Sequence, residues 1–351
     1  MSTKDDVEFL ALLVHRRKLS KDLAEAVFTE LQRGGELDPL LEGALGCSAS
    51  EVAKLRRTRA GEIPEIPGYE VIQKIGSGGT ADVFRVHEKK SGRVIALKVL
   101  REDQAENAAT KKAFVEEAKL LEKLRHAGLV EGYGAARFGE IYFSRLEYID
   151  GRTLLEMLDD DVRFDETQAL RIVLTVAEVL AWLGAHAVVH RDIKPGNIML
   201  ASDGRVKLID LGFAACEGAR ARNDKAVGTV QYLSPEQCRG GAAADARSDI
   251  YSLGVTLFHL VVGRLPFDSS DDHEVLRMQV MQSLSSPELK SRGLSPHLHY
   301  FIEKMMAKEV ELRYQTWQEL IDDVQSQLAG RESLDFERDA REKPKRNGRA
   351  R

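Results

Sequence analysis

The sequence has little of what marks secreted, membrane-spanning or nucleic-acid-binding proteins. It contains 3 cysteines in 351 residues, and because they are scattered without metal-ligand spacing they are typical of a reducing compartment. Polar residues interrupt the long apolar stretch at 251–262, which is too short to cross a bilayer. The apolar residues 9–14 follow acidic ones, unlike those of a signal peptide. We therefore expect a cytoplasmic protein without a membrane span.

The sequence also lacks an excess of basic over acidic residues. The chain has 51 Lys and Arg against 56 Asp and Glu, a net charge of −5, whereas binding to a phosphate backbone favours a basic excess. Nucleic acid is therefore not an expected partner. With 43% hydrophobic and 30% charged residues, the composition is that of an ordinary globular protein. The length suits one two-lobed domain and a small accessory segment.

Changes of pattern divide the chain into four segments. Residues 1–60 have apolar residues at helical spacing and predict a helical accessory segment, with Ser20 and Ser50 as N-caps. Residues 61–68 contain two prolines and predict a linker. Residues 69–328 predict the main domain. Residues 329–351 mix both charges with few apolar residues and predict a disordered tail.

The main domain is predicted to be α+β, with two lobes. Alternating apolar residues predict strands at 69–75, 82–87 and 94–100, then a helix from about 105 to 125 and two strands ending at Glu147. Helices dominate from Thr153 onward, apart from a short β-rich part at 198–209. A β-rich lobe followed by a larger helical lobe suits a nucleotide bound between them.

The octet HRDIKPGN at residues 190–197 places three different chemical functions on one short turn. Asp192 can receive a proton from a hydroxyl nucleophile, and Lys194 can hold the charge of a phosphoryl group. Asn197 offers a carbonyl oxygen to a hard cation. Phosphoryl transfer needs little more than positioning and charge stabilisation, so this octet indicates that chemistry.

Glycines at residues 76–79 join the first two predicted strands. They allow backbone N–H groups to approach phosphates without a Cβ in the way. The run leads into a strand and not into a helix, so it is not a dinucleotide fingerprint. A glycine-rich hairpin that binds no ligand would show the same pattern.

A lysine inside an apolar strand, Lys98, is costly unless it meets an anion. An edge-strand lysine that reaches water is the alternative. In the predicted helix after it, Glu117 shares a face with Phe114 and Leu121, while Glu116 lies among lysines. Glu117 is therefore the expected partner of Lys98.

Asp210 follows a predicted buried strand and precedes Gly212. A carboxylate at a strand end suits Mg²⁺ that also touches substrate phosphates. A common strand-to-turn connection would look the same, but its spacing after Asn197 favours a shared metal site.

From Tyr69 to about Leu328 these motifs, in this order, resemble the eukaryotic-type protein kinases, particularly the Ser/Thr kinases of bacteria. The resemblance implies a protein kinase fold and transfer of the γ-phosphate of ATP to Ser or Thr hydroxyls of proteins. Asp192, Lys194, Lys98 and Glu117 would be catalytic, and Asn197 and Asp210 would bind Mg²⁺, or Mn²⁺ as a substitute. The implied nucleotide-binding residues are Ile75, Gly76, Ser77, Gly78, Gly79, Thr80, Ala81, Val83, Ala96, Lys98, Glu147, Tyr148 and Met199.

The same resemblance implies roles for residues outside the catalytic and nucleotide-binding sets. Asp249 would anchor the catalytic loop, Glu236 would pair with Arg313 for stability, and Thr229 would lie in the substrate site. The activation segment, residues 213–227, contains no Ser, Thr or Tyr. Related kinases with an arginine in the place of Arg191 commonly need a phosphate there. Our hypothesis is that Glu217 or Asp224 neutralises Arg191 instead; ordering by a partner is the alternative.

Two further alternatives stay open. A pseudokinase would bind nucleotide and regulate a partner by conformation, but such proteins usually lose one of the five residues Lys98, Glu117, Asp192, Asn197 and Asp210, all present here. Residues 1–60 could form a docking module for a regulatory partner, or a small bundle that packs on the kinase domain.

Overall fold

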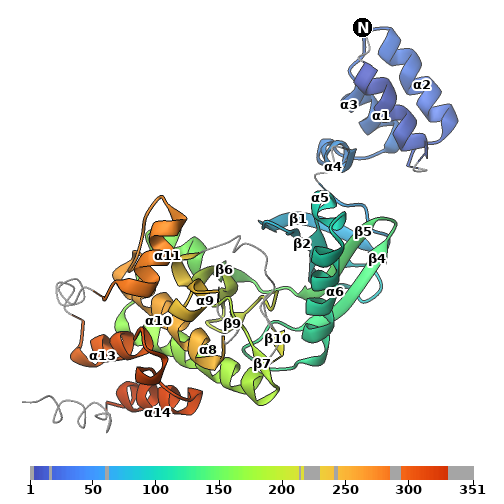
Figure 1. Cartoon of the computed structure of the whole chain (residues 1–351). Coiled ribbons are helices and arrows are strands. Elements are labelled where there is room, and N and C mark those ends of the chain that lie inside the picture. The colour runs from blue at the N-terminus through green and yellow to red at the C-terminus, as the bar shows by residue number, and fades with distance from the viewer. Residues whose placement is uncertain are drawn as a thin grey trace, which may run out of the picture. The chain divides into compact units, whose positions relative to one another are not determined.

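The computed structural model describes residues 4–15, 18–59, 63–212, 215–216, 230–240, 244–284 and 294–330. The chain divides into two compact units. Figure 1 labels the helices and strands along the chain. The first comprises Met1–Ala108 with Ala136–Phe143, and the second Ala109–Ala135 with Ser144–Arg351. The predicted disordered tail therefore lies, from residue 331 on, outside the described residues.

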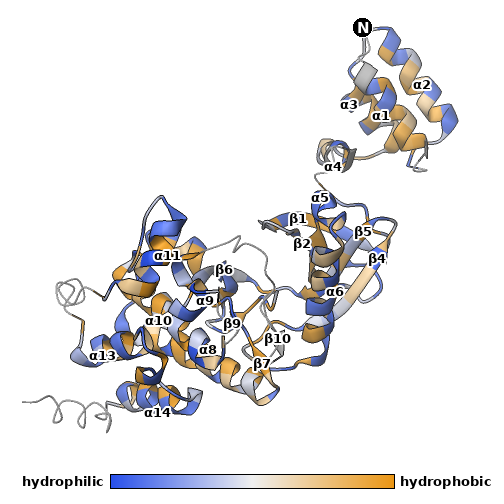
Figure 2. Ribbon diagram, viewed as in Figure 1, coloured by the Kyte–Doolittle hydropathy of each residue, from blue (hydrophilic) through white to orange (hydrophobic). Residues whose placement is uncertain are grey.

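Four helices occupy the N-terminal segment: α1 (Lys4–His15), α2 (Lys21–Gln32), α3 (Leu37–Leu45) and α4 (Ala49–Arg59). In α1, α2 and α3, hydrophobic (orange) and hydrophilic (blue) residues alternate as in amphipathic helices, whereas α4 is mainly hydrophilic (Figure 2). The apolar sides meet in one cluster whose largest fully buried members are Phe9, Leu13 and Leu41. This segment is thus a small bundle with its own core.

One N-cap is confirmed and the other is wrong. The Ser20 hydroxyl accepts the amide of Leu23 at 3.3 Å, as predicted. Helix α4 begins at Ala49, one residue before Ser50. Ser48 is at its start instead, with its amide and hydroxyl both donating to Glu51 Oε2, at 2.7 and 2.9 Å. The glutamate three residues after Ser48 completes half a capping box there, which selects Ser48 over Ser50.

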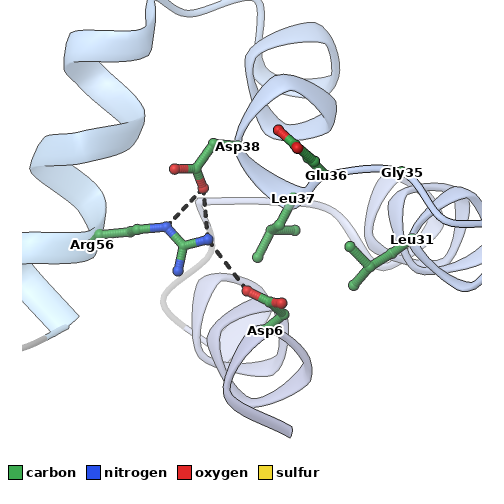
Figure 3. Close-up of a pocket in the computed structure, with 7 residues that line it drawn as sticks. All are labelled: Asp6, Leu31, Gly35, Glu36, Leu37, Asp38 and Arg56. Atoms are coloured by element: carbon green, nitrogen blue, oxygen red, sulfur yellow. Dashed lines mark hydrogen bonds and ion pairs between the residues drawn. The ribbon is translucent and has the colours of Figure 1, made fainter. Parts of the chain in front are cut away.

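Arg56 ties three helices of the bundle together (Figure 3). Its Nε donates to Asp38 Oδ1 at 2.7 Å, and its terminal nitrogen lies 3.3 Å from Asp6 Oδ1. The guanidinium also lies 5.2 Å from the centroid of the Phe9 ring. Arg56, Asp38 and Asp6 border a cavity of about 350 Å³.

A five-stranded sheet follows, in the order β1-β2-β3-β5-β4. Its strands are β1 (Tyr69–Ser77), β2 (Ala81–Glu88), β3 (Arg93–Leu100), β4 (Gly132–Phe138) and β5 (Ile141–Glu147), each close to its predicted range. Both pairs among the first three strands are antiparallel. Strand β1 contains two bulges, between Val71 and Gln73 and between Lys74 and Gly76, each adding one residue against β2.

The second unit is mainly helical. Helices α8 (Glu166–Ala185) and α10 (Ala246–Val262) form its core, and α13 (Pro296–Met305) and α14 (Trp317–Leu328) pack against them. The other helices are α5 (Glu102–Ala105, in the first unit), α6 (Ala108–Lys123, at the boundary of the units), α7 (Leu154–Asp159), α9 (Pro235–Cys238) and α11 (Asp272–Met281). A fold with a sheet-rich N-terminal part and a helical later part was predicted, and it is confirmed.

Short strands and turns of 3₁₀ helix position the loops of this unit. The strands are β6 (Gly151–Thr153), β7 (Val188–Val189), β8 (Ile198–Ala201), β9 (Val206–Leu208) and β10 (Ala215–Cys216). The 3₁₀ helices are η1 (Pro195–Asn197), η2 (Val230–Tyr232) and η3 (Val310–Leu312). Because β8 pairs with β9, the turn that holds Asn197 lies beside the end of the strand that precedes Asp210.

Among the described residues, α8 alone has the length and apolar composition of a membrane span. Half of its apolar window is buried within the fold, and the helix packs against α10 and α14. It begins with a capping box, in which Asp165 and Gln168 exchange hydrogen bonds at 2.8 and 3.1 Å. Burial in a protein core accounts for its hydrophobic residues.

Candidate active site

A buried carboxylate holds the loop that contains the octet. Asp249, in the first turn of α10, is 2% exposed and accepts the backbone amides of His190 and Arg191 at 2.8 and 2.7 Å. Burial raises the pKa of the Asp249 carboxyl, and the two amides and the nearby positive charge offset only part of this effect. The predicted anchoring role of Asp249 is thus confirmed by its contacts.

The loop brings Asp192, Lys194 and Asn197 together. Lys194 Nζ lies 2.8 Å from Asp192 Oδ2 and 3.1 Å from Oδ1. Asn197 Nδ2 donates to Asp192 Oδ2 at 2.9 Å and to its backbone carbonyl at 2.8 Å. Because the amide nitrogen of Asn197 is directed at Asp192, its carbonyl oxygen points away from that carboxylate. This oxygen is a suitable ligand for a hard cation.

The backbone before Asp192 is turned sharply. Arg191 has φ +70°, a left-handed conformation that is unfavourable for a residue with a side chain. Its carbonyl accepts a hydrogen bond from Gln237 Nε2 of α9 at 3.1 Å, and Asp249 holds its amide. These two contacts support a conformation that would otherwise be sparsely populated.

Asp210 and Asn197 are linked through the backbone. The amide of Ile209 donates to the carbonyl of Asn197 at 2.9 Å, and the amide of Gly212 donates to Asp210 Oδ1 at 2.7 Å. Asn197 and Asp210 thus offer two side-chain oxygens from neighbouring turns, and oxygen atoms are the ligands that hard divalent cations prefer. No cluster of three or more His, Cys, Asp or Glu side chains suited to a metal occurs in the described parts of the chain.

The two neighbouring glutamates of α6 differ as predicted. Glu117 is only 9% exposed, whereas the Glu116 carboxylate is 53% exposed and lies 3.7 Å from Lys112 Nζ. A Cβ placed on Gly212 would lie 3.6 Å from Glu117 Oε2 and 3.0 Å from Asp210 Oδ1. Glu117 therefore borders the same turn as Asp210.

In the first unit, the strand register aligns part of the predicted nucleotide site. Gly76 pairs with Val83, and Val83 pairs with Lys98, so the three residues lie in a row across β1, β2 and β3. Lys98 is half-buried, and Ala96, two residues before it, lies on the same face of β3. Lys98 and Glu117 belong to different units, so their pairing stays a prediction.

The glycine turn between β1 and β2 is held by a small polar cluster. Asp82 Oδ1 accepts the Ser77 hydroxyl at 2.6 Å and lies 2.9 Å from Lys74 Nζ. Burial raises the pKa of Asp82, but the contacts with Ser77 and Lys74 outweigh it and lower the pKa. The amide of Gly78 donates to the carbonyl of Ala81 at 2.9 Å. Gly78, Gly79 and Thr80 are exposed at the tip, and Ile75 is half-buried.

The predicted hinge contains an ion pair that sequence reasoning missed. Glu147 Oε2 lies 2.8 Å from Lys207 Nζ and accepts the amide of Glu131 at 3.1 Å. Lys207 is 6% exposed and also donates to the Leu129 carbonyl at 3.3 Å. The Glu147 side chain is therefore engaged by Lys207, and its backbone amide donates to the carbonyl of Glu131 at 2.8 Å, which leaves the Glu147 carbonyl as the group that could serve an adenine ring. Tyr148 and Met199 are half-buried.

Glu236 and Arg313 form the predicted pair. Arg313 is 2% exposed, and its two terminal nitrogens donate to the two Glu236 oxygens at 2.7 and 2.9 Å. Burial alone would raise the pKa of Glu236, but Arg313 and the Ser248 hydroxyl lower it to about 2. Of the activation segment, only residues 215–216 are described; Arg191's expected partners Glu217 and Asp224, and Thr229, lie outside the described residues.

Comparisons with known proteins agree with this geometry. A family model described as "Protein kinase domain" matches residues 69–324. A probable serine/threonine-protein kinase of Streptomyces coelicolor is 33% identical over 273 residues, covering 75% of this chain and 40% of that protein. PrkC of Bacillus subtilis is 32% identical over 260 residues (74% and 40%), and PknB of Mycobacterium leprae is 34% identical over 263 residues (73% and 42%). The chain spans about two fifths of the length of these curated relatives.

Proposed function

Because the chain belongs to the protein kinase family, and its relatives are serine/threonine kinases of bacteria, we propose that it transfers the γ-phosphate of ATP to Ser or Thr hydroxyls of protein substrates. Members of this family use ATP and a divalent metal ion. The observation that carries the proposal is the cluster of Asp192, Lys194 and Asn197, held by the buried Asp249.

In the proposed reaction, Asp192 orients the substrate hydroxyl and accepts its proton as the oxygen attacks the γ-phosphorus. The bond from that phosphorus to the oxygen bridging it to the β-phosphate breaks, and ADP leaves. Lys194, at 2.8 Å from Asp192, would compensate the charge on the transferred group. Asn197 and Asp210 would hold Mg²⁺, or Mn²⁺ as a substitute, and the bound ion would neutralise phosphate charge.

We propose that the first unit supplies the rest of the nucleotide site. Lys98 would contact the α- and β-phosphates and pair with Glu117, and the backbone of residues 76–81 would cover the phosphates. Ile75, Val83, Ala96 and Met199 would line the adenine ring, with the backbone at Glu147 and Tyr148 as the hinge. The row of Gly76, Val83 and Lys98 across three strands supports this arrangement.

For the organisation of the chain, we propose a helical accessory segment at 1–60, a linker at 61–68, a kinase domain at 69–328 and a disordered tail at 329–351, with the kinase domain in the cytoplasm. The separate apolar core of α1–α4 supports an independent accessory segment. We propose that these helices bind a regulatory partner. Deletion of residues 1–60, followed by assays of turnover and of partner capture, tests it.

The substitution Asp192→Asn tests the catalytic proposal against the pseudokinase alternative. We expect a loss of phosphate transfer of about 10²–10⁴-fold, because the proton acceptor is removed. ATP binding, measured by calorimetry, should change little. Asp203→Asn is the matched control, since Asp203 is an exposed carboxylate of the same unit. Equal transfer by wild type and Asp192→Asn, or no transfer by wild type with normal ATP binding, would contradict kinase activity at this site.

We also propose that activity does not need a phosphate on the activation segment, because residues 213–227 contain no hydroxyl side chain. Ser234, which follows the segment, is fully buried and caps α9, which makes it a poor acceptor. The purified protein should keep its turnover after treatment with a Ser/Thr phosphatase, with complete removal of phosphate verified by mass spectrometry. Loss of turnover, restored by phosphate on Thr229 or Ser234, would refute this idea.

A further inference from the structure

A series of buried hydrogen bonds ends at the short segment η2, which lies shortly after the activation segment in the sequence. Gln279 of α11 is fully buried, and its Nε2 donates to the backbone carbonyl of Gln231 in η2. Its Oε1 accepts the Tyr251 hydroxyl at 2.6 Å. Gln231 and Gln279 are 48 residues apart in sequence, so this contact joins two distant segments.

Lys308 determines which groups donate and which accept in this series of hydrogen bonds. Its Nζ donates to the Tyr251 hydroxyl at 2.9 Å and to the carbonyl of Gln279 at 2.7 Å, and it lies 4.3 Å from the centroid of the Phe267 ring. An ammonium group has only donors, so the Tyr251 oxygen must accept from Lys308 and its single proton must go to Gln279 Oε1. Burial lowers the pKa of Lys308 to about 8, which leaves the group mainly charged at pH 7.

The orientation of the Gln279 amide follows from this direction. If the amide were flipped, its NH₂ group would face a hydroxyl that already accepts from Lys308, and its oxygen would face the Gln231 carbonyl. The Gln231 carbonyl and the Gln279 side-chain oxygen would then face each other, both buried and without a hydrogen-bond donor. Leaving buried acceptors unpaired costs free energy of folding. The donors therefore run from Lys308 through Tyr251 and Gln279 to the carbonyl of Gln231.

The same segment is held from a second helix and leads to the octet. Ser252 of α10 donates to the carbonyl of Tyr232 at 2.7 Å. Three residues further on, at Pro235, α9 begins, and its Gln237 donates to the carbonyl of Arg191 beside Asp192. Segment η2 thus lies in sequence between Thr229, the expected substrate-facing residue, and the support of the catalytic loop.

We propose that Gln279 is a positioning residue that, with Tyr251 and Lys308, holds segment η2 in the conformation that receives the protein substrate. The inference rests on the proposed kinase function for its kinetic consequence, but the structural part concerns η2 alone. Loss of the Gln279 donor should therefore weaken the productive binding of the protein acceptor and leave the binding of ATP unchanged. A general contribution to stability would alter neither in the folded enzyme.

The decisive substitution is Gln279→Glu, which keeps the shape and, as an ionised carboxylate, keeps the acceptor for Tyr251 but has no donor for Gln231. Tyr251→Phe removes the hydrogen bond from the Tyr251 hydroxyl to Gln279 and keeps the ring in the core. This variant provides the test if Gln279→Glu does not fold. The matched control is Gln282→Glu, the same change at an exposed position just after α11. All are made in the full-length chain.

Two readouts separate the outcomes. By amide hydrogen exchange, residues 230–233 should exchange about tenfold faster in Gln279→Glu and Tyr251→Phe than in wild type or Gln282→Glu, as expected for one lost buried hydrogen bond. With myelin basic protein as acceptor, KM for the acceptor should rise by about the same factor, with KM for ATP within about twofold of wild type.

Unchanged exchange at residues 230–233 in folded variants would overturn the proposal, as would equal changes in the two KM values. If exchange rises as expected but wild type transfers no phosphate to any acceptor, the positioning of η2 is supported and the proposed kinase function fails. The two claims therefore fail by different results.

Discussion

The N-terminal bundle and the helical unit around Asp192 are stabilised by different kinds of contact. Every described buried polar or charged side chain of the protein lies at residue 117 or later, while the bundle core is a cluster of nine apolar residues. In the ion pairs that Arg56 forms within the bundle, the side chains of Arg56, Asp38 and Asp6 are 33%, 46% and 19% exposed. In the helical unit Asp249, Gln279 and Arg313 are at most 2% exposed.

This difference reflects what each region must position. The bundle consists of helices joined by short turns, whose backbone groups are satisfied within the helices. The helical unit has to hold irregular segments, the octet and η2, whose backbone amides and carbonyls need partners from elsewhere. Buried side chains of α10 and α11 supply these partners. Polar groups inside the second unit are therefore placed where the loops need them.

The largest expected effect in this comparison is that of Asp249→Ala. The change leaves two buried backbone amides without an acceptor, each worth about 1–3 kcal/mol, so the free energy of unfolding should fall by about 2–5 kcal/mol. Urea unfolding followed by the fluorescence of Trp182 and Trp317 measures it. Asp38→Ala in the bundle is the control. A loss no greater than that of the control would contradict the distinction between the two regions.

Glu236→Gln should have the next largest effect, and it should depend on pH. The pKa of Glu236 is lowered from 4.5 to about 2, so its pairing with Arg313 stabilises the folded state above about pH 4.5 and loses this contribution as the pH falls towards 2. The shift corresponds to about 3 kcal/mol at neutral pH. Unfolding free energies measured from pH 7 to pH 3 should therefore fall less steeply for the variant. Parallel curves would show that Glu236 does not have this low pKa.

A smaller effect is expected from Lys207→Met, because the Glu147 side chain keeps 20% exposure. Removal of one partner from an ion pair whose carboxylate is still partly exposed should cost about 2 kcal/mol, less than for a fully buried pair. The double variant Lys207→Met with Glu147→Gln should recover part of the loss, since no unpaired carboxylate remains. Additive losses in this thermal-unfolding cycle would mean that the two side chains do not interact.

The smallest effect should be that of Arg56→Gln in the bundle. The side chains of Arg56, Asp6 and Asp38 are 33%, 19% and 46% exposed, so solvent and salt screen their contacts partly. The loss should be at most about 1 kcal/mol and should shrink at 1 M salt. The measurement is the unfolding midpoint at low and high salt. A loss as large as that of Asp249→Ala would remove the contrast between the bundle and the helical unit.

Local patterns predicted much of the fold and of the candidate site. Strands β1, β2 and β3 follow from alternation, and helical periodicity separates Glu117 from Glu116, because both depend on residues close in sequence. The octet indicated three adjacent side chains that the structure places within hydrogen-bond distance. Ser48 could have been found as well, since a glutamate follows it at capping-box spacing.

Contacts between distant segments were not predictable in this way. Lys207 looked like an ordinary strand lysine, and its partner Glu147 is 60 residues away. Gln279 lies in a helix whose surroundings come from α10, η2 and the residues after α13. A single sequence shows which side chains can form hydrogen bonds but not which segments the fold brings together, so such buried networks emerge only from the structure.

The two bulges of β1 also restrict how the strand can vary in length. Each bulge adds one residue, and side chains alternate between the faces of a sheet, so a single extra residue reverses the facing of everything after it, while two restore the parity. Deleting one residue between Val71 and Gly76 would thus turn the strand end before the glycine turn to the opposite face. Paired deletions should be tolerated far better than single ones.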